Sequence, residues 1–178
     1  MKTHYIERIS FLYKELFNMH IHLREMPSTG VFGFQIWSNE LVKFKHEVLG
    51  LTLGKKTDIK IPRAIMDNEE LAKAFLRGLF DTDGCIYIEN KRGKPYPKIQ
   101  ISSVSKLLIE QIVTILSRLG YRVTCHRHDR AKYGWNDLYA VVIRGDVMSE
   151  RWFSEIRPQN SKHINKFKRW KENKMSPA

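Results

Sequence analysis

Two aspartates, Asp81 and Asp83, stand on either side of a threonine and directly before Gly84. Carboxylates at this spacing are oxygen ligands for hard cations, and a similar Asp-x-Asp-Gly run occurs in calcium-binding EF-hand loops. The EF-hand is excluded, because its first ligand position would hold Leu79 and its position 12 would hold Asn90 instead of glutamate. The two acids therefore serve another chemistry, which depends on the elements that position them.

The segment before the acids, residues 68–81, is predicted to be a helix that is buried on most sides. From Leu71 to Asp81 the polar residues are Lys73, Arg77 and Asp81, which fall at positions i, i+4 and i+8 and form one narrow stripe. A helix that is apolar over the rest of its circumference is typical of a buried element.

The ends and one face of this helix are also predicted. Asp67 is the expected N-cap, with Glu70 three residues on, and Gly84 marks the break after the helix. Ala74 and Gly78 lie four residues apart on one face, where their small side chains would let another backbone come close.

The composition limits the class of protein. The 178 residues are 42% hydrophobic and carry a formal net charge of +12, spread over several segments, which favours a basic nucleic-acid-binding surface over a merely basic globular protein. No apolar run approaches the ~20 residues of a membrane span and no secretory pattern opens the chain, so an intracellular protein without a membrane partner is expected. Cys85 and Cys125 match no metal or redox spacing and are expected to be reduced thiols.

The chain contains the same order of elements twice: a helix (6–16 and 109–119), a strand (19–25 and 121–128), a second strand (31–37 and 138–144) and a helix (38–50 and 146–158). At an offset of 103, Ile6, Glu7, Ile9 and Leu16 match Ile109, Glu110, Ile112 and Leu119. Only the second copy is preceded by the buried helix and by strands at 85–90 and 98–103. The predicted domains are a partial repeat at 1–66 and a complete unit at 67–178 that ends in a basic helix or tail.

Alternation along the predicted strands separates two faces. Ile86, Ile99 and Ile101 are expected to face helices, together with Val123 and Cys125. The other face carries residue types that pair with base edges and phosphates, which favours a DNA-binding face over an ordinary solvated one. Its predicted members are Tyr87, Glu89, Lys98, Gln100, Ser102, Arg122, Thr124, His126, His128 and Arg144, with His20, His22 and Arg24 from the first copy. His126 and His128 beside Cys125 are more typical of exposed histidines than of metal ligands.

The stretch Leu76-Arg77-Gly78-Leu79-Phe80-Asp81-Thr82-Asp83-Gly84 closely resembles the signature of the LAGLIDADG homing endonucleases. Phe80 is a conservative change, and Arg77 is the clear departure. The resemblance implies an α+β (mixed α/β) fold, with an αββαββα unit and a curved antiparallel DNA-binding sheet. It also implies that the signature helix is an interface helix, at which Ala74 and Gly78 allow close approach and Asp81 supports the helix end or the interface.

The resemblance further implies the chemistry. Asp83 would be the ligand of Mg²⁺ or another divalent cation, with the Thr82 carbonyl as a further ligand. By position after the last helix of each repeat, Lys162 and either Lys55 or Lys56 are the candidates for a catalytic lysine, with plain phosphate contact or surface charge as the alternatives.

The expected function is therefore sequence-specific cleavage of double-stranded DNA. The alternative is a non-cleaving nucleic-acid-binding protein of the same fold, either an intron RNA maturase or a DNA-binding regulator. Cutting both strands requires two acids and the chain brings one signature helix, so a homodimer or a second chain that supplies the missing motif is expected.

Overall fold

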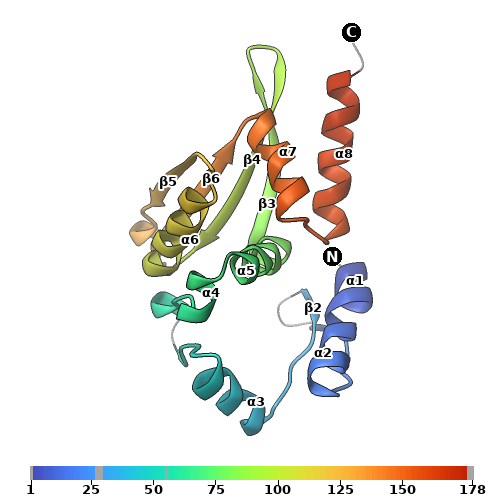
Figure 1. The fold of residues 1–178 in the computed structure, drawn as a ribbon, viewed down its shortest axis with the longest axis vertical. Helices are drawn as coiled ribbons and strands as arrows, with labels where there is room; N and C mark the ends of the chain where they lie inside the picture. The colour runs from blue at the N-terminus through green and yellow to red at the C-terminus, as the bar shows by residue number, and fades with distance from the viewer. Residues whose placement is uncertain (1, 27–29, 55, 176–178) are drawn as a thin grey trace.

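A four-stranded antiparallel sheet forms the centre of the C-terminal part of the chain (Figure 1). Its strands, β3 (Gly84–Lys91), β4 (Lys94–Ser103), β5 (Val123–His128) and β6 (Leu138–Arg144), lie in the order β3-β4-β6-β5. The hairpin between β3 and β4 turns at Arg92 and Gly93, whose φ angles of +54° and +77° are those of a two-residue type I′ turn. The structure, a computed structural model, describes residues 2–26, 30–54 and 56–175.

Three helices pack on one face of this sheet: α5 (Glu69–Asp83), α6 (Lys106–Arg118) and α7 (Asp146–Glu155). Ile86, Ile99 and Ile101 are each at most 2% exposed within the core, which confirms the predicted inward face of these two strands. Phe80 and Trp152 meet edge to face there, with ring centroids 5.4 Å apart. The order α5-β3-β4-α6-β5-β6-α7 confirms the predicted αββαββα unit.

The last helix, α8 (Ser161–Met175), lies beside β3 and α7 (Figure 1). Phe167 of α8 stacks on Phe153 of α7 with ring centroids 3.9 Å apart. The Trp170 indole N–H donates to the Pro95 carbonyl oxygen at 3.3 Å, and Trp170 is 2% exposed. The predicted basic C-terminal helix is therefore packed onto the unit by an apolar face.

The N-terminal part repeats the order helix, strand, strand, helix. A continuous helical stretch, α1 (Lys2–His4), η1 (Tyr5–Ile9) and α2 (Ser10–Phe17), precedes β1 (Arg24–Met26) and β2 (Val31–Gly33), and α3 (Asn39–Lys43) with η2 (Phe44–Val48) follows. A short helical turn, η3 (Lys56–Asp58), and α4 (Arg63–Asp67) lead into α5. In the described chain no element covers the start of a second αββαββα unit, and the division of the chain at residues 66 and 67 stays a prediction.

The strands predicted at 19–25 and 31–37 are wrong over most of their length. Residues 19–23 and 34–37 lie outside any strand, and β1 and β2 form a separate two-stranded pair. A pair without further neighbours gains little from additional ladder hydrogen bonds. Instead, aromatic packing holds this segment, because Phe34 lies edge to face against Tyr13 with ring centroids 5.0 Å apart.

The predicted start of the signature helix needs correction, whereas the predicted break at Gly84 is confirmed. The N-cap is Asn68, whose Oδ1 accepts from the Leu71 N–H at 3.0 Å, whereas Asp67 ends α4 and pairs with Arg63. α5 ends at Asp83, and Gly84 follows it as the C-cap with φ −87°, an extended conformation. It is a glycine because a Cβ there would lie 2.3 Å from Phe80 Cδ2 and 2.7 Å from the Phe80 carbonyl oxygen. Among the described residues, no helix is long and apolar enough to cross a membrane.

Candidate active site and nucleic-acid interface

The two acids of the motif have different surroundings at the end of α5. Asp83 is exposed, and the Thr82 hydroxyl lies in donating distance of its Oδ2, at 3.1 Å, and of the Gly78 carbonyl oxygen, at 3.0 Å. The C-terminal end of a helix carries a partial negative charge, which adds to the attraction of a carboxylate for cations. Asp83 is thus available to a ligand from solvent.

Asp81 is 4% exposed and is held inside the chain. Its carboxylate accepts hydrogen bonds from the backbone N–H groups of Gln159, at 2.9 Å, and Asn160, at 3.1 Å. These residues directly precede α8, so Asp81 fixes the start of that helix. Support of the helix end is the arrangement seen, and no second chain is needed for it.

A cavity of about 440 Å³ opens beside Asp83, lined by the linker at 51–60, by α5, and by the end of β4 with the start of α6. Lys56 lines this cavity together with Asp83, and so does Lys60, which the sequence reasoning missed. Lys60 lies in an irregular segment without hydrophobic periodicity, so nothing in the sequence indicates that it lies near Asp83. Lys55 lies outside the described residues.

Lys162 is placed elsewhere, in the first turn of α8, where it is exposed. Its charge acts with that of Lys166 on Cys85, the second residue of β3: burial raises the pKa of the Cys85 thiol, and the two lysines oppose this shift. Lys162 is not among the residues that line the Asp83 cavity. The structure therefore brings Lys56, and not Lys162, into the same cavity as the exposed acid.

The α5 face with the small residues is uncovered. Ala74 and Gly78 are exposed, Leu71 is 48% exposed, and a Cβ added at Gly78 would meet nothing within 4 Å. The motif's departing residue lies on another side of the helix, where the Arg77 Nε–H donates to the Ile156 carbonyl oxygen at 2.7 Å. Burial of α5 on most sides is thus incomplete within one chain.

The sheet face opposite the helices carries the predicted polar side chains in register. The pairs Tyr87–Lys98, Lys98–Arg144, Gln100–Val142 and Thr124–Val142 place Tyr87, Glu89, Lys98, Gln100, Ser102, Thr124, His126, His128 and Arg144 on one face. Arg122 is exposed just before β5. Ten of the thirteen predicted DNA-contacting residues are thus on or next to this face.

Hydrogen bonds and an ion pair orient several side chains of this sheet face within the chain itself. Arg144 donates to Thr124 Oγ1 at 3.1 Å and lies 2.8 Å from His126 Nε2. Lys98, only 8% exposed, forms an ion pair with Glu89. Lys98 is therefore neutralised in the isolated chain and must exchange its partner before it can contact a phosphate.

The three predicted contacts from the first copy do not join this sheet. His20 and His22 are exposed but precede β1, and Arg24 lies on β1, where its guanidinium donates to Gln35 Oε1 at 3.3 Å. The reason is that β1 and β2 form a sheet of their own, separate from the four-stranded one.

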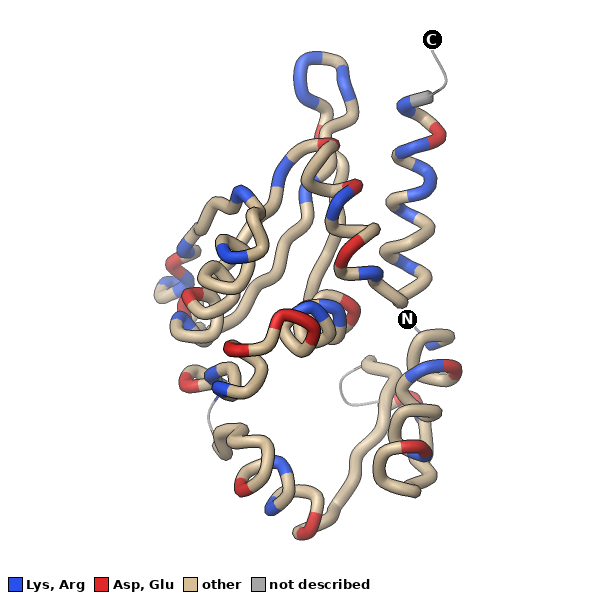
Figure 2. The backbone as a smooth tube through the Cα atoms, in the orientation of Figure 1, with Lys and Arg blue, Asp and Glu red and all other residues tan. Residues whose placement is uncertain are grey.

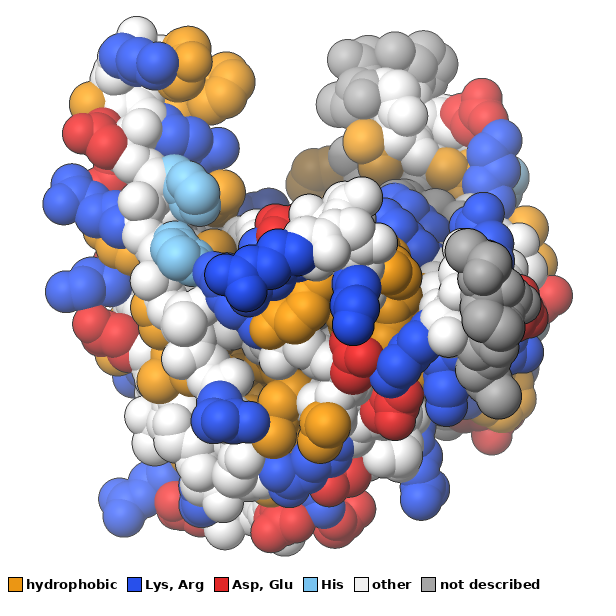
Figure 3. All heavy atoms as spheres, turned by 90° about the horizontal axis from the view of Figure 1, so that it is seen from above, with side chains coloured by type: hydrophobic (Ala, Val, Ile, Leu, Met, Phe, Trp, Pro, Cys, Tyr) orange, Lys and Arg blue, Asp and Glu red, His pale blue; other side chains and the backbone are white. Residues whose placement is uncertain are grey.

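Basic side chains follow the outer parts of the molecule. Lys and Arg lie along α8 and at the tip of the β3–β4 hairpin (Figure 2). Seen from above, the surface is hollowed, and Lys, Arg and His side chains lie along one wall and at the base of the hollow (Figure 3). A concave basic surface is the form that an extended polyanion fits.

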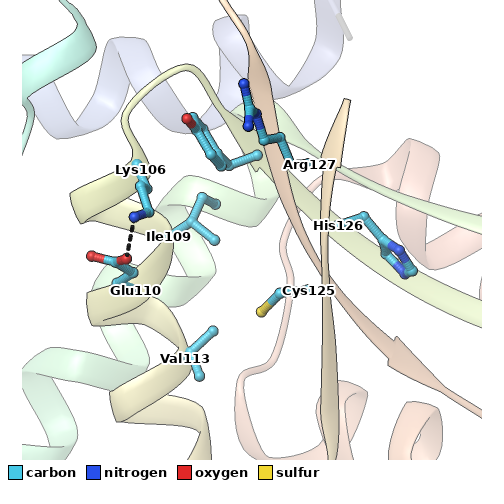
Figure 4. A pocket seen from close by; sticks show the side chains of 8 residues that line it. Lys106, Ile109, Glu110, Val113, Cys125, His126 and Arg127 are labelled. Carbon is cyan, nitrogen blue, oxygen red and sulfur yellow. Dashed lines mark ion pairs between the residues drawn. The ribbon is translucent and has the colours of Figure 1, made fainter. Parts of the chain in front are cut away.

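The alternative metal site at Cys125, His126 and His128 is not formed. Cys125 points toward α6, into a cavity of about 540 Å³ with Ile109 and Val113, whereas His126 points away from it (Figure 4). Within residues 2–26, 30–54 and 56–175, no group of three His, Cys, Asp or Glu side chains is placed to hold a metal ion.

Known proteins of much greater length each contain a segment that resembles part of this chain. A glutamine–fructose-6-phosphate aminotransferase of Methanocaldococcus jannaschii is 25% identical over 139 residues, which are 78% of this chain and 12% of that enzyme. The ATP-dependent DNA helicase Hel308 of the same organism is 28% identical over 90 residues, or 46% of this chain and 7% of the helicase. The chain thus spans a small fraction of these relatives.

Solved structures of the homing endonuclease I-DmoI share the fold. A complex with its target DNA in the presence of magnesium has a TM-score of 0.59 and 20% identity, and covers 89% of this chain and 77% of that one. A second DNA complex, with manganese, has a TM-score of 0.57 and 21% identity, with coverage of 86% and 71%. The family model of the LAGLIDADG-like domain matches residues 70–157, and this part of the chain therefore belongs to the LAGLIDADG family.

Proposed function

We propose that the chain is a sequence-specific double-strand DNA endonuclease that uses Mg²⁺ or another divalent cation. The observation that carries this proposal is the exposed Asp83 carboxylate in one cavity with Lys56 and Lys60, at the end of the motif helix and next to the polar sheet face. The DNA complexes of I-DmoI, solved with magnesium and manganese, support it by analogy of fold.

The donor set fits a magnesium ion that keeps most of its water. Mg²⁺ in nucleic-acid enzymes is commonly bound through one or two carboxylates together with waters and phosphate oxygens. Asp83 supplies one such carboxylate, and the Thr82 carbonyl is the second proposed ligand. When bound, the cation would activate water and offset charge on the leaving oxygen of a phosphodiester.

The chain's own residues have separate roles in this proposal. The Thr82 hydroxyl orients the Asp83 carboxylate through the 3.1 Å contact. Lys56 and Lys60 stabilise the negative charge that grows on the phosphate, and in a cavity partly closed to water this effect is larger than on an open surface. Lys162 contacts the DNA backbone without taking part in the reaction.

A second copy is proposed to complete the enzyme. One chain offers one Asp83, and cleavage of two strands requires two such centres. The uncovered α5 face with Leu71, Ala74 and Gly78 is where a second α5 would pack, which would bring two Asp83 residues close together.

The alternative is a protein that binds nucleic acid without cutting it, as a DNA-binding regulator or an RNA maturase. It is favoured by one observation, the lack of a second motif helix against α5 in the described chain. The aminotransferase and helicase activities of the relatives do not enter the proposal, because the shared segment is 12% and 7% of those proteins.

The test begins with selection of bound duplexes from a randomised DNA library in calcium, followed by incubation of the selected duplex with Mg²⁺ or Mn²⁺. We expect double-strand cleavage by the native chain, and binding without cleavage by Asp83→Asn. Asp67→Asn, which changes an exposed aspartate on α4, is the matched control and should cut normally. Binding by the native chain without cleavage in either metal would reject the endonuclease in favour of the regulator, and selection of structured RNA alone would favour the maturase.

A further inference from the structure

The connection between β5 and β6, residues 129–137, presents two aromatic rings to solvent. Tyr133 is 58% exposed and Trp135 is 61% exposed, although apolar rings of this size are usually more buried. Their ring centroids are 5.5 Å apart and the planes are tilted by 37°. The two rings therefore form one exposed aromatic surface at the end of the sheet.

A cation accompanies each ring. The Arg130 guanidinium lies 5.3 Å from the Trp135 ring centroid, and the Lys132 ammonium lies 4.8 Å from the Tyr133 centroid. The acids of the loop are already engaged, because Asp129 Oδ1 accepts from the Ala131 N–H at 2.8 Å and Asp137 forms an ion pair with Arg127 at 2.7 Å. Within the described loop, the two cations beside the rings are thus not ion-paired with either acid.

The loop is held in shape without help from the rings. Gly134 has φ +68°, a left-handed conformation that glycine adopts without strain, and its N–H donates to the Ala131 carbonyl oxygen at 2.9 Å. The Arg130 Nε–H donates to the Asn136 carbonyl oxygen at 3.0 Å. Tyr133 and Trp135 are therefore pre-organised, so little conformational entropy is lost when a ligand stacks on them.

The loop lies at the end of the polar sheet face. β5 enters the loop at His128, which pairs with Leu138 at the start of β6, and His126 and His128 lie on the face that carries Arg144. A strand of nucleic acid that follows this face would reach the loop at its end.

We infer that Tyr133 and Trp135 form a stacking platform for unpaired bases of single-stranded nucleic acid, with Arg130 and Lys132 as contacts to the flanking phosphates. Exposed aromatic rings beside cations are the feature by which proteins hold bases that have left a duplex, because each base has a π face and the backbone is anionic. The inner bases of a duplex are stacked on each other and cannot use these rings. The inference goes beyond cleavage, since it needs neither Asp83 nor a metal ion.

The test measures binding of a fluorescein-labelled thymidine oligonucleotide of about 12 nucleotides, a length within the usual site sizes for single strands. It uses the Asp83→Asn chain in EDTA, so that cleavage does not contribute. We expect the double variant Tyr133→Ala/Trp135→Ala to bind the oligonucleotide at least about tenfold more weakly, as expected for the loss of one or two stacked bases.

Trp37→Ala is the matched control, because Trp37 is even more exposed, at 92%, and belongs to the N-terminal part of the chain. This variant should bind the oligonucleotide like the parent. A blunt duplex of the same length should bind parent and double variant within about twofold, since it offers few unstacked bases.

Fluorescence provides a second readout that does not depend on affinity. Trp37 and Trp135 are the exposed tryptophans of the described chain, whereas Trp152 and Trp170 are at most 2% exposed. In a Trp37→Phe background, stacking of a thymine on Trp135 should quench the emission at saturating oligonucleotide.

Unchanged binding of the oligonucleotide by a folded double variant, or equal weakening for oligonucleotide and duplex, would overturn the inference. Loss of metal-dependent cleavage in Asp83→Asn tests the proposed endonuclease separately, because the platform assay contains no metal.

Discussion

Asn160 donates two hydrogen bonds to Asp81, one from its side chain and one from its backbone. The Asn160 side-chain amide donates to the Asp81 backbone carbonyl oxygen at 2.7 Å, and the Asn160 backbone N–H donates to Asp81 Oδ1 at 3.1 Å. Asn160 is 2% exposed, so these bonds are shielded from water. The first acid of the motif thereby joins the end of α5 to the start of α8, and the second acid, Asp83, is left free for a ligand.

Replacement of Asp81 by alanine is expected to destabilise the protein strongly. The N–H groups of Gln159 and Asn160 would lose a charged acceptor in a site closed to water, and each such bond contributes roughly 1.5–3 kcal/mol. We expect the free energy of unfolding to fall by about 2–4 kcal/mol in urea denaturation.

Asp83→Ala is the control for this prediction, because the same change is made two residues away at an exposed position. Its effect on the free energy of unfolding should stay within about 0.5 kcal/mol, as for surface substitutions in general. Equal effects of the two variants would show that Asp81 does not anchor α8.

Gly84→Ala is expected to be destabilising for a steric reason. The added Cβ would lie 2.7 Å from the Phe80 carbonyl oxygen and 2.8 Å from Phe80 Cα, which are backbone atoms that cannot turn away. We expect a loss of roughly 1–3 kcal/mol in the free energy of unfolding, similar to other overpacked sites, measured by urea denaturation. Gly93→Ala makes the same change in an open turn, where nothing lies within 4 Å of the new atom, so its cost should come from its positive φ alone and stay near 1 kcal/mol. A smaller loss for Gly84→Ala than for Gly93→Ala would contradict this account.

How far the sequence predicts the structure depends on whether periodicity carries the information. Strong alternation predicts the inward face of Ile86, Ile99 and Ile101, and the αββαββα unit is what the family resemblance implies; the structure confirms both. The pattern at 19–25 alternates as well, but its extension as a strand depends on neighbouring strands that the N-terminal part lacks. Hydrophobic alternation along a segment predicts which face of a sheet each residue occupies. It does not predict which other strands lie close enough to pair with that segment.

In the candidate site, too, residues within the motif are predictable from the sequence, whereas residues placed by packing are not. The motif predicts Asp83 and Thr82 as site residues because the helix, the acid and the glycine are contiguous in sequence. Lys60 enters the same cavity through the course of an irregular linker, which no spacing rule describes. The contact of Arg77 with the Ile156 carbonyl likewise joins residues 79 positions apart, so the departure from the motif has a reason that only the packing reveals.

The lysines are expected to separate into two classes. Lys56→Ala and Lys60→Ala remove charges from the Asp83 cavity, and we expect at least one of them to lower kcat of DNA cleavage by about 10²-fold, as for other groups that stabilise transition-state charge. Lys162→Ala should leave kcat unchanged and weaken binding, with a salt dependence reduced by about one counterion. Single-turnover cleavage and binding titrations at several salt concentrations check this, and a kcat loss confined to Lys162→Ala would contradict the assignment.

Acid pH is expected to destabilise the protein through His163. Burial lowers the pKa of His163 below its ordinary value of about 6.5, and the nearby positive charges of Lys162, His4 and Lys166 act in the same direction, whereas Asp81 opposes them. Below pH ~6.5 the unfolded chain takes up a proton that the folded chain does not, so the contribution of neutral His163 is present above this pH and is lost as the pH falls toward the folded pKa.

The matching measurement is urea denaturation between pH 7.5 and pH 5. His163→Gln should show a weaker fall of the free energy of unfolding over this range than the native chain, by at most about 1.4 kcal/mol per pH unit for one proton. His20→Gln also removes one histidine, but from an exposed position, and should keep the native pH dependence. Parallel curves for His163→Gln and the native chain would exclude a role of His163.

Substitutions at Gly78 test the proposed α5–α5 contact because their effects on one chain and on two chains have opposite signs. Within one chain a Cβ at Gly78 meets nothing within 4 Å, and alanine in a helix interior is about 1 kcal/mol more favourable than glycine. Gly78→Leu should therefore leave the folded monomer at least as stable as the native one.

In a dimer the same leucine would keep the two helices apart. We expect light scattering to give a mass near twice 21.1 kDa for the native chain and a monomer mass for Gly78→Leu, with double-strand cleavage lost in that variant. A native chain that stays monomeric with and without DNA, or a Gly78→Leu chain that still forms a dimer and cuts both strands, would show that the missing acid is not supplied through this face.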